Sequence, residues 1–218
     1  MTQSKTPGLF ITLEGPEGSG KSTHAPRLAE YLRSLGRDVL LTREPGGTSI
    51  GDQIRFVLND HANTAIQPSA ESLLFCASRA QLVSQMIRPQ LERGGTVVCD
   101  RFSDSTIAYQ GYGRGLDLTI LQSICDFASG RLKPDVTLLL DLPVETGLAR
   151  RRQGKGDWNR LDAQEVDFHR RVRQGYLEIS RLEPSRWIRI DAEKEEEDVW
   201  SQILQAVASR IGSGKENC

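Results

Sequence analysis

Two kinds of apolar pattern alternate along the chain. In the first, a few apolar residues stand together between polar ones, which is typical of a buried strand. In the second, apolar residues recur every three or four positions, which is typical of an amphipathic helix. Runs of the first kind occupy residues 9–13, 39–42, 96–99, 136–141 and 187–191. Because helical segments separate these runs, the pattern predicts an α/β fold with a five-stranded parallel sheet and helices on both faces.

The helical segments predicted by the second pattern differ in length and in the residues that interrupt them. They lie around residues 28–35, 50–58, 68–92, 105–110, 118–128, 143–152, 163–182 and 195–211. Pro26 removes a backbone N–H near the second turn of the first helix, and Pro89 is expected to end or kink the long helix near its C-terminus. The glycines within residues 111–115 predict a flexible loop.

The stretch between the first predicted strand and the first helix carries the clearest chemistry. It reads Gly15-Pro16-Glu17-Gly18-Ser19-Gly20-Lys21-Ser22 and fits G-x-x-x-x-G-K-[ST]. Glycines let backbone N–H groups surround a phosphate at the positive end of the helix. Lys21 adds a charge for the β- and γ-phosphates, and Ser22 offers a hydroxyl to Mg²⁺. A glycine-rich turn with a surface lysine is the alternative, and the strand–loop–helix context favours an ATP site with Mg²⁺ as cofactor.

Composition narrows the class of protein and its partners. The chain has 218 residues, of which 38% are hydrophobic and 26% charged, and this predicts one soluble domain over residues 1–218 with disordered tails at 1–8 and 212–218. A net charge of −1 gives no basic field for nucleic acid. No apolar run approaches the roughly 20 residues that cross a bilayer, so no membrane partner is predicted. Cys76, Cys99 and Cys125 lie in apolar surroundings and are predicted to be buried free thiols in a reducing cytoplasm.

Charged residues follow three of the predicted strands. Glu14 and Arg43 end two of them, and Asp100 and Arg101 end the third. Ligands of open parallel sheets bind beyond the carboxyl ends of the strands, so these residues are expected to share one site. Asp100 is predicted to hold Mg²⁺ with Ser22, directly or through water. Each residue alone could be a solvated strand end, but two arginines away from the ATP loop indicate a second phosphorylated substrate.

The basic stretch at residues 150–160 predicts a mobile lid, at about 150–162. It contains Arg150, Arg151, Arg152, Lys155 and Arg160 within a glycine-containing segment. A closing lid would bring positive charge over the transferring phosphoryl group and exclude water. A solvated basic helix end, favourable to the helix dipole, explains the run equally well. The chain has no late N-K-x-D sequence of a guanine-selective GTPase and no second domain, which leaves a small phosphotransferase.

Several short motifs then occur in one order. After the phosphate loop with Glu17 come Thr42-Arg43-Glu44-Pro45-Gly46-Gly47-Thr48, Phe75-x-Ala77-x-Arg79, Asp100-Arg101-Phe102 and Ser105-Thr106-x-Ala108-Tyr109-Gln110-Gly111. In this ordered set the chain resembles bacterial thymidylate kinase over about residues 9–211. The resemblance implies a fold like that of P-loop nucleoside monophosphate kinases. It implies transfer of the γ-phosphoryl group of the co-substrate ATP to dTMP, with Mg²⁺, and a homodimer.

The resemblance also implies a role for individual residues. Glu17 would approach the 3′-hydroxyl of the deoxyribose, Arg43 and Arg101 would hold the dTMP phosphate, Phe75 would stack on thymine, Arg79 would bond its O4 edge, Thr106 and Gln110 would face the nucleotide, and Tyr109 would crowd the ribose 2′ position. From the residues alone, Phe75 on an apolar helix face is better explained as core.

The lid is where the chain departs from the family. The phosphate loop of this chain has Glu17-Gly18 where some relatives place a basic residue. The resemblance therefore implies that lid arginines assist Lys21 and Arg101 in catalysis. Arg152 and Arg160 are the candidates. The family usually reads Asp-Arg-x-Glu at the end of the lid, and this chain has Asn159 and Asp162 in the acidic positions. A deoxynucleoside kinase, or a nucleotide-binding module without turnover, remains as the alternative function.

Overall fold

A five-stranded sheet forms the centre of the molecule, as the computed structural model shows for residues 8–154 and 158–212. The strands are β1 (Leu9–Glu14), β2 (Val39–Arg43), β3 (Thr96–Asp100), β4 (Val136–Asp141) and β5 (Trp187–Asp191). Their order is β2-β3-β1-β4-β5, and every neighbouring pair is parallel. The predicted fold class is confirmed, and each predicted strand matches an observed one to within one residue at its end.

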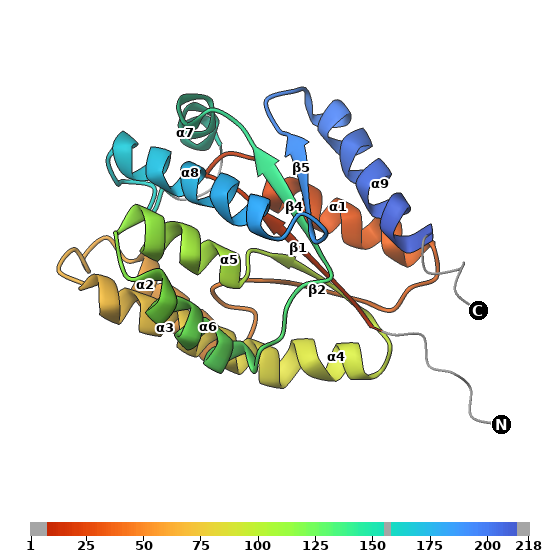
Figure 1. The fold of residues 1–218 in the computed structure, drawn as a ribbon, viewed down its shortest axis with the longest axis horizontal. Helices are drawn as coiled ribbons and strands as arrows, with labels where there is room; N and C mark the ends of the chain where they lie inside the picture. The colour runs from red at the N-terminus through yellow and green to blue at the C-terminus, as the bar shows by residue number, and fades with distance from the viewer. Residues whose placement is uncertain (1–7, 155–157, 213–218) are drawn as a thin grey trace.

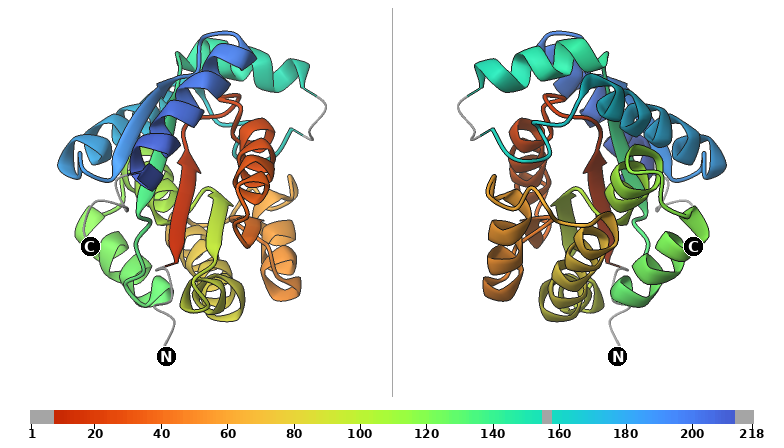
Figure 2. Two further views of the ribbon diagram at one scale, coloured as in Figure 1. Left: turned by 90° about the vertical axis from the view of Figure 1, so that its right-hand side faces the viewer. Right: turned by 90° about the vertical axis from the view of Figure 1, so that its left-hand side faces the viewer.

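Helices cover both faces of this sheet (Figures 1 and 2). They are α1 (Lys21–Ser34), α2 (Ser49–Asn59), α3 (Pro68–Leu82), α4 (Arg88–Glu92), α5 (Ser103–Thr106), α6 (Leu118–Ser129), α7 (Val144–Gln153), α8 (Val166–Leu182) and α9 (Glu196–Gly212), with π-helical segments η1 (Val83–Ile87) and η2 (Ile107–Gly113). None of the helices formed by the described residues combines the length and apolar composition needed to cross a bilayer.

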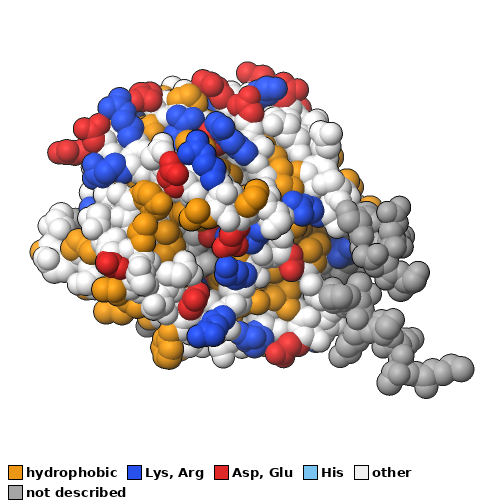
Figure 3. All heavy atoms as spheres, viewed as in Figure 1, with side chains coloured by type: hydrophobic (Ala, Val, Ile, Leu, Met, Phe, Trp, Pro, Cys, Tyr) orange, Lys and Arg blue, Asp and Glu red, His pale blue; other side chains and the backbone are white. Residues whose placement is uncertain are grey.

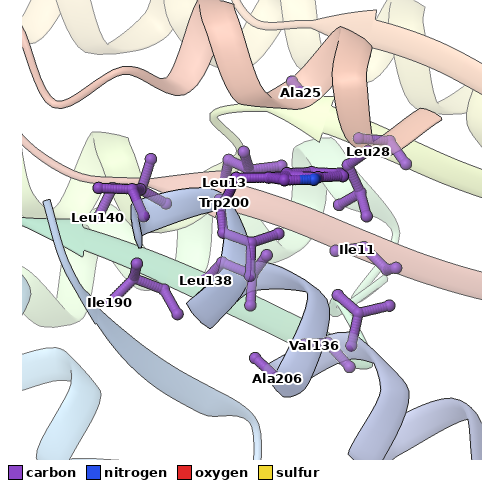
Figure 4. Close-up of a cluster of buried hydrophobic side chains, with 14 of the residues drawn as sticks. Ile11, Leu13, Ala25, Leu28, Val136, Leu138, Leu140, Ile190, Trp200 and Ala206 are labelled. Carbon is purple, nitrogen blue, oxygen red and sulfur yellow. The ribbon is translucent and has the colours of Figure 1, made fainter. Parts of the chain in front are cut away.

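The two faces of the sheet carry different side chains because successive strand residues point to opposite sides. Ile11 and Leu13 of β1 pack with Leu138 and Leu140 of β4 against α1 and α9, where Trp200 fills the centre (Figure 4). On the other face, Phe10 of β1 joins a cluster under η1 and α4. Both faces are therefore buried, which explains the almost continuous apolar runs of the strands.

The predicted helix over residues 68–92 is one helical rod with a change of hydrogen bonding inside it. It begins at Pro68 as predicted, but residues 83–87 form the π-helical segment η1 between α3 and α4. Arg88 donates its backbone N–H to the carbonyl of Val83, five residues back. Pro89 lacks an N–H to continue the α-helical ladder, so the wide turn before it is the local response. The proline alters the helix without ending it.

The predicted flexible loop at residues 111–115 is wrong, because η2 extends to Gly113 and packs against α8. A Cβ on Gly113 would lie 2.7 Å from the Phe168 ring, and one on Gly175 would lie 2.7 Å from the Tyr112 ring. These glycines therefore permit close approach of two helices. Glycine-rich composition indicates either flexibility or tight packing, and the sequence alone does not separate them.

Other local predictions have mixed outcomes. Helix α1 continues through Pro26 to Ser34, whereas α8 begins at Val166, three residues later than predicted. Cys76, Cys99 and Cys125 are buried free thiols, as predicted. The tails predicted at 1–8 and 212–218 fall outside the described residues except at Gly8 and Gly212, and Lys155 of the predicted lid lies outside them as well.

Candidate active site

A cavity of about 1050 Å³ lies at the carboxyl ends of the strands. Arg43 of β2 is in register with Asp100 of β3, and Asp100 with Leu13 of β1, so three strands end at the same level. Most predicted site residues line this cavity: Glu17, Gly18, Ser19, Gly20, Lys21, Ser22, Arg43, Phe75, Arg79, Asp100, Arg101, Thr106, Tyr109 and Gln110. The lining does not include Gly15, Pro16, Arg152 or Arg160.

The phosphate loop holds its lysine close. Lys21 Nζ donates to the carbonyls of Gly15 and Pro16 at 3.0 and 2.7 Å, and to Ser19 Oγ at 3.0 Å. Burial and the charge of Arg101 lower the pKa of Lys21 to about 8. Gly20, with φ of 89°, precedes α1 in the left-handed conformation that favours glycine. The loop oxygens thus hold the ammonium group at the entrance to the helix, where a phosphate would take their place.

Glu17 is the carboxylate at the centre of the cavity wall. Its Oε1 accepts hydrogen bonds from Tyr109 Oη and, at 3.3 Å, from Arg101 Nη2. Its Oε2 lies 3.2 Å from Nδ1 of His169. Burial raises the pKa of Glu17, but the hydrogen bond from His169 and the charges of Arg101 and Lys21 outweigh burial and lower it to about 2. Glu17 therefore remains ionised at neutral pH.

Arg101 reaches the cavity through an unusual backbone conformation. Its φ is 72°, a left-handed value that costs energy in a residue with a Cβ and that occurs mainly at functional sites. The guanidinium donates to the Gly15 carbonyl and to Tyr176 Oη, both at 3.1 Å, and lies 4.9 Å from the centre of the Tyr109 ring. The turn after β3 thus places this cation between the phosphate loop and η2.

A second group of cations lines the same cavity as the phosphate loop residues. The side chain of Arg43 is 56% exposed and only loosely paired, at 3.7 Å, with Asp52. Arg55 of α2 lines the same cavity and donates to the Pro45 carbonyl at 3.0 Å. Burial and the nearby charge of Arg43 lower the pKa of Arg55. Arg55 is not among the site residues predicted from the sequence, although its place in the helix that follows the Arg43 loop was an available signal.

Phe75 keeps part of its surface open to the cavity and belongs to none of the buried core clusters among the described residues. The core explanation for this residue is therefore disfavoured. An aromatic ring at the wall of a polar cavity is suited to stacking on a base.

The polar residues beside Phe75 are fixed by buried carboxylates that are not among the site residues predicted from the sequence. Arg79 is 1% exposed, and its Nη2 lies 2.6 Å from Glu44 Oε2 and 3.0 Å from Thr106 Oγ1. Gln110 Nε2 donates to Glu71 Oε1 at 2.9 Å. These pairs leave the polar side chains in one fixed arrangement.

The arginines of the predicted lid differ in their contacts. Arg150 donates to the carbonyls of Ala192 and Glu193, at 2.6 and 2.9 Å, and Arg151 pairs with Asp162 at 2.8 Å. Arg152 is exposed and stacks on Trp158, 5.3 Å from the ring centre. Basic side chains gather over α7 and α8 on this side of the molecule (Figure 3).

Arg160, a candidate for catalysis, is placed away from the cavity surface. It is 6% exposed, pairs with Glu71 Oε2 at 2.5 Å and donates to the Leu58 carbonyl at 3.0 Å. Asp162 accepts the backbone N–H of Asn159 at 2.9 Å, and the Asn159 side chain accepts that of Leu161 at 2.8 Å. Asn159 and Asp162 thus form the turn at the end of the lid, and Arg160 fastens this turn to α2 and α3.

The donors available to Mg²⁺ are few but chemically suitable. Ser22 is exposed in the cavity and Asp100 is half-buried in it, so a hydroxyl and a carboxylate face the same space. No group of three or more His, Cys, Asp or Glu side chains within the described part of the chain is placed to hold a metal. Mg²⁺ at kinase sites uses one or two carboxylates with substrate phosphates, so Ser22 and Asp100 fit this ion.

Glu14, fully buried at the end of β1, should make stability depend on pH. It accepts hydrogen bonds from the Phe102 N–H and the Ser105 and Tyr176 hydroxyls, and burial raises its pKa to about 7. The folded protein therefore holds this proton more tightly than the unfolded chain. The stabilisation is full below about pH 4.5 and is lost as pH rises through about 7.

The measurement compares urea unfolding of the wild type with that of Glu14→Gln at pH 5 and pH 8. The free energy of unfolding should fall by roughly 2–3 kcal/mol more in the wild type than in the variant over this range. The variant cannot titrate at this position, so the difference isolates Glu14. Parallel pH dependences in the two proteins would contradict the assignment.

Comparison with known proteins gives one family. The sequence model of the family described as thymidylate kinase matches residues 13–203. A thymidylate kinase of Herpetosiphon aurantiacus is 50% identical, over 93% of this chain and 96% of its own length. One of Deinococcus radiodurans is 50% identical, over 93% and 98%. The crystal structure of thymidylate kinase from Ehrlichia chaffeensis is similar with a TM-score of 0.75 and 32% identity, covering 92% of this chain and 99% of that one.

Proposed function

The chain belongs to the thymidylate kinase family, and on this premise we propose that it transfers the γ-phosphoryl group of ATP to dTMP, giving ADP and dTDP. The observation that carries the proposal is the position of Arg101. Its guanidinium contacts the phosphate loop at Gly15 and shares one cavity with Arg43 and Arg55. One cavity thus offers a site for a donor phosphate and a site for an acceptor phosphate.

We propose that residues 15–22 bind ATP. The backbone of the glycine loop would surround the phosphates, and Lys21 would exchange its loop oxygens for those of the β- and γ-phosphates. Ser22 and Asp100 would hold Mg²⁺, with Asp100 acting directly or through water. The bound ion would neutralise charge on the β- and γ-phosphate oxygens.

The opposite side of the cavity would bind dTMP. Arg43 and Arg101, with Arg55 beside them, would hold its phosphate, for which guanidinium geometry is well suited. The remaining roles follow the resemblance and the position of each side chain on the cavity wall. Glu17 would accept the 3′-hydroxyl, Phe75 would stack on thymine, Arg79 would bond its O4 edge, Thr106 and Gln110 would face the nucleotide, and Tyr109 would crowd the 2′ position.

The reaction needs positioning more than acid–base chemistry. An oxygen of the dTMP phosphate, already anionic at neutral pH, forms the new bond to the γ-phosphorus. The bond from that phosphorus to the bridging oxygen breaks in line, and ADP leaves with the electron pair. Lys21 and Arg101 would neutralise the charge that develops in the transition state.

Of the two candidate lid arginines, neither of which lines the cavity, Arg152 is the one whose guanidinium is free to move toward the transferring group. Arg160 is already buried against Glu71, whereas Arg152 is exposed, stacks on Trp158 and forms no ion pair with a described residue. Arg152→Ala should therefore lower kcat, and Arg160→Ala should act mainly on the docking of the lid turn and on stability.

A coupled ADP-release assay with dTMP, thymidine, dUMP and dCMP tests the function. dTMP should be the best acceptor, and thymidine should be inactive because it brings no phosphate to Arg43 and Arg101. Activity with thymidine and none with dTMP would identify a deoxynucleoside kinase. Binding of ATP and dTMP without production of dTDP would identify a nucleotide-binding module. Arg152→Ala and Arg160→Ala belong in the same assay.

We also propose that the protein is cytoplasmic and forms a homodimer. An apolar groove between α3 and α6 supports the homodimer. Leu73, Ile120, Ile124 and Phe127 line it, and Phe127 is 89% exposed. A second copy related by two-fold symmetry would cover this surface. Phe127→Asp should therefore produce monomers in sedimentation velocity at concentrations where the wild type is dimeric.

The matched control for this experiment is Leu182→Asp at the end of α8, because Leu182 is 78% exposed and is not in the groove. It should leave the dimer intact. A monomeric wild type, or equal effects of the two substitutions, would contradict the proposed interface.

A further inference from the structure

His169 is a buried histidine that the reaction described above does not use. It lies in the first turn of α8 and is 1% exposed. Its Nδ1 lies 3.2 Å from Glu17 Oε2, while its Nε2 is buried and has no hydrogen-bond partner among the described residues. Buried polar atoms are almost always paired, so an unpaired ring nitrogen needs a reason beyond packing. Within the described part of the chain, the ring makes one polar contact, which is the contact with Glu17.

The direction of that hydrogen bond follows from the state of Glu17. An ionised carboxylate only accepts hydrogen bonds, so Nδ1 of His169 carries the hydrogen and donates the hydrogen bond to Glu17. The sequence places His169 and Glu17 152 residues apart, and the fold brings them together because α8 packs across η2. The ring packs edge-on against Phe168, which in turn packs edge-on against Tyr109. The same turn of α8 therefore supports two donors to one carboxylate.

Counting acceptor positions shows what these contacts leave. A carboxylate offers about four lone-pair positions. Tyr109 and Arg101 occupy two on Oε1, and His169 occupies one on Oε2. His169 is the only described residue that holds Oε2, and together with the two donors on Oε1 it fixes the orientation of the carboxylate. One position on Oε2 then remains for a hydroxyl from the substrate.

We propose that His169 is a positioning residue for the acceptor sugar, which holds Glu17 so that its remaining lone pair meets the 3′-hydroxyl of dTMP. The inference rests on the proposed function, and in particular on the role of Glu17. The donor on His169 does not touch the substrate; it acts through the orientation of Glu17. Its loss should therefore matter only for substrates that carry a 3′-hydroxyl.

The experiment measures KM and kcat for dTMP and for 3′-deoxy-dTMP, which lacks that hydroxyl. The variants are His169→Leu, which fills the space without a donor, and His169→Asn, whose amide N–H can replace Nδ1–H. His169→Leu should raise KM for dTMP about tenfold, the loss expected for one hydrogen bond to a charged group, and leave KM for the 3′-deoxy substrate within about twofold. His169→Asn should restore KM for dTMP to within about threefold of the wild type.

The outcomes separate this inference from the function beneath it. Equal effects of His169→Leu on both substrates would show that His169 only packs, and would overturn the inference. Glu17→Gln is measured in parallel. If Glu17→Gln loses the preference for the 3′-hydroxyl and His169→Leu keeps it, the inference alone fails. If neither variant changes the preference, the role of Glu17 fails, and if the wild type makes no dTDP, the proposed function fails.

If His169→Leu does not fold, a comparison of two amide variants still tests the inference. His169→Asn and His169→Gln differ in where the amide lies, and Gln places it one carbon farther along the side chain. Positioning through Nδ1 predicts that Asn retains the preference for the 3′-hydroxyl and Gln loses it. Equal behaviour of the two amides would overturn the inference.

Discussion

Replacing Lys21 with alanine should lower kcat by about 10³-fold and leave the affinity for dTMP nearly unchanged. The ammonium group is the cation that the phosphate loop holds, through Gly15, Pro16 and Ser19, at the N-terminus of α1. Without the ammonium group, one cation fewer would neutralise the charge of the transferring phosphoryl group. The dTMP phosphate is proposed to bind Arg43 and Arg101, which the substitution leaves in place.

The coupled ADP-release assay gives kcat, and titration calorimetry with dTMP gives the affinity of the acceptor site. Lys133→Ala is the matched control, because the Lys133 side chain is 60% exposed and pairs only with a partly exposed Glu183 among described residues. The control should have wild-type kinetics. A loss of less than tenfold in kcat for Lys21→Ala, or a parallel loss of dTMP affinity, would refute the role given to Lys21.

Replacing Glu44 with alanine should cost about 3–5 kcal/mol of the free energy of unfolding. Glu44 and Arg79 form a buried pair, with side chains 4% and 1% exposed and 2.6 Å between Arg79 Nη2 and Glu44 Oε2. Without Glu44, the buried guanidinium of Arg79 keeps only Thr106 Oγ1 and the thiols of Cys76 and Cys125 as polar neighbours among the described residues. Removal of one partner from a buried pair is far more destabilising than the worth of the pair itself.

The same substitution should also impair recognition of thymine. Arg79 is proposed to read the O4 edge of the base, and Glu44 fixes its orientation through both Nε and Nη2. Urea unfolding gives the change in stability, and the ratio of kcat/KM for dTMP and dCMP gives discrimination between bases. Glu197→Ala, which breaks the exposed pair with Arg27, should leave both measurements unchanged. A stability loss below about 1 kcal/mol for Glu44→Ala would show that Arg79 finds another partner or water.

The parts of the molecule that could be predicted are those with a local signal. The strands were predictable because burial on both faces leaves uninterrupted apolar runs, and the phosphate loop because its glycines and Lys21 occupy consecutive positions. The ends of the strands then located Arg43, Asp100 and Arg101 at one edge. The structure confirms that these residues line a common cavity.

The partners of the site residues had no such signal. Glu44 lies 35 residues from Arg79, and Glu71 lies 89 residues from Arg160. In the sequence, Arg160 is one of several cations in a basic run. Only the position of Glu71 shows that the guanidinium of Arg160 is already paired with a carboxylate. From the residues alone Phe75 was better explained as core for the same reason, since helical periodicity places the residue on α3 but does not show which faces α3 buries.

Glu71 also has a consequence for anyone who redesigns this protein. Gln110, Arg114 and Arg160 all donate to its two oxygens, so Gln110, which is proposed to face the nucleotide, and Arg160 of the predicted lid share one carboxylate. Free-energy changes of substitutions at these three positions should not add, because each removes a donor that the others then compensate or fail to compensate. Double-mutant cycles are needed to assign an effect to any one of them. A library that varies Gln110 to change base preference should therefore vary Arg160 at the same time.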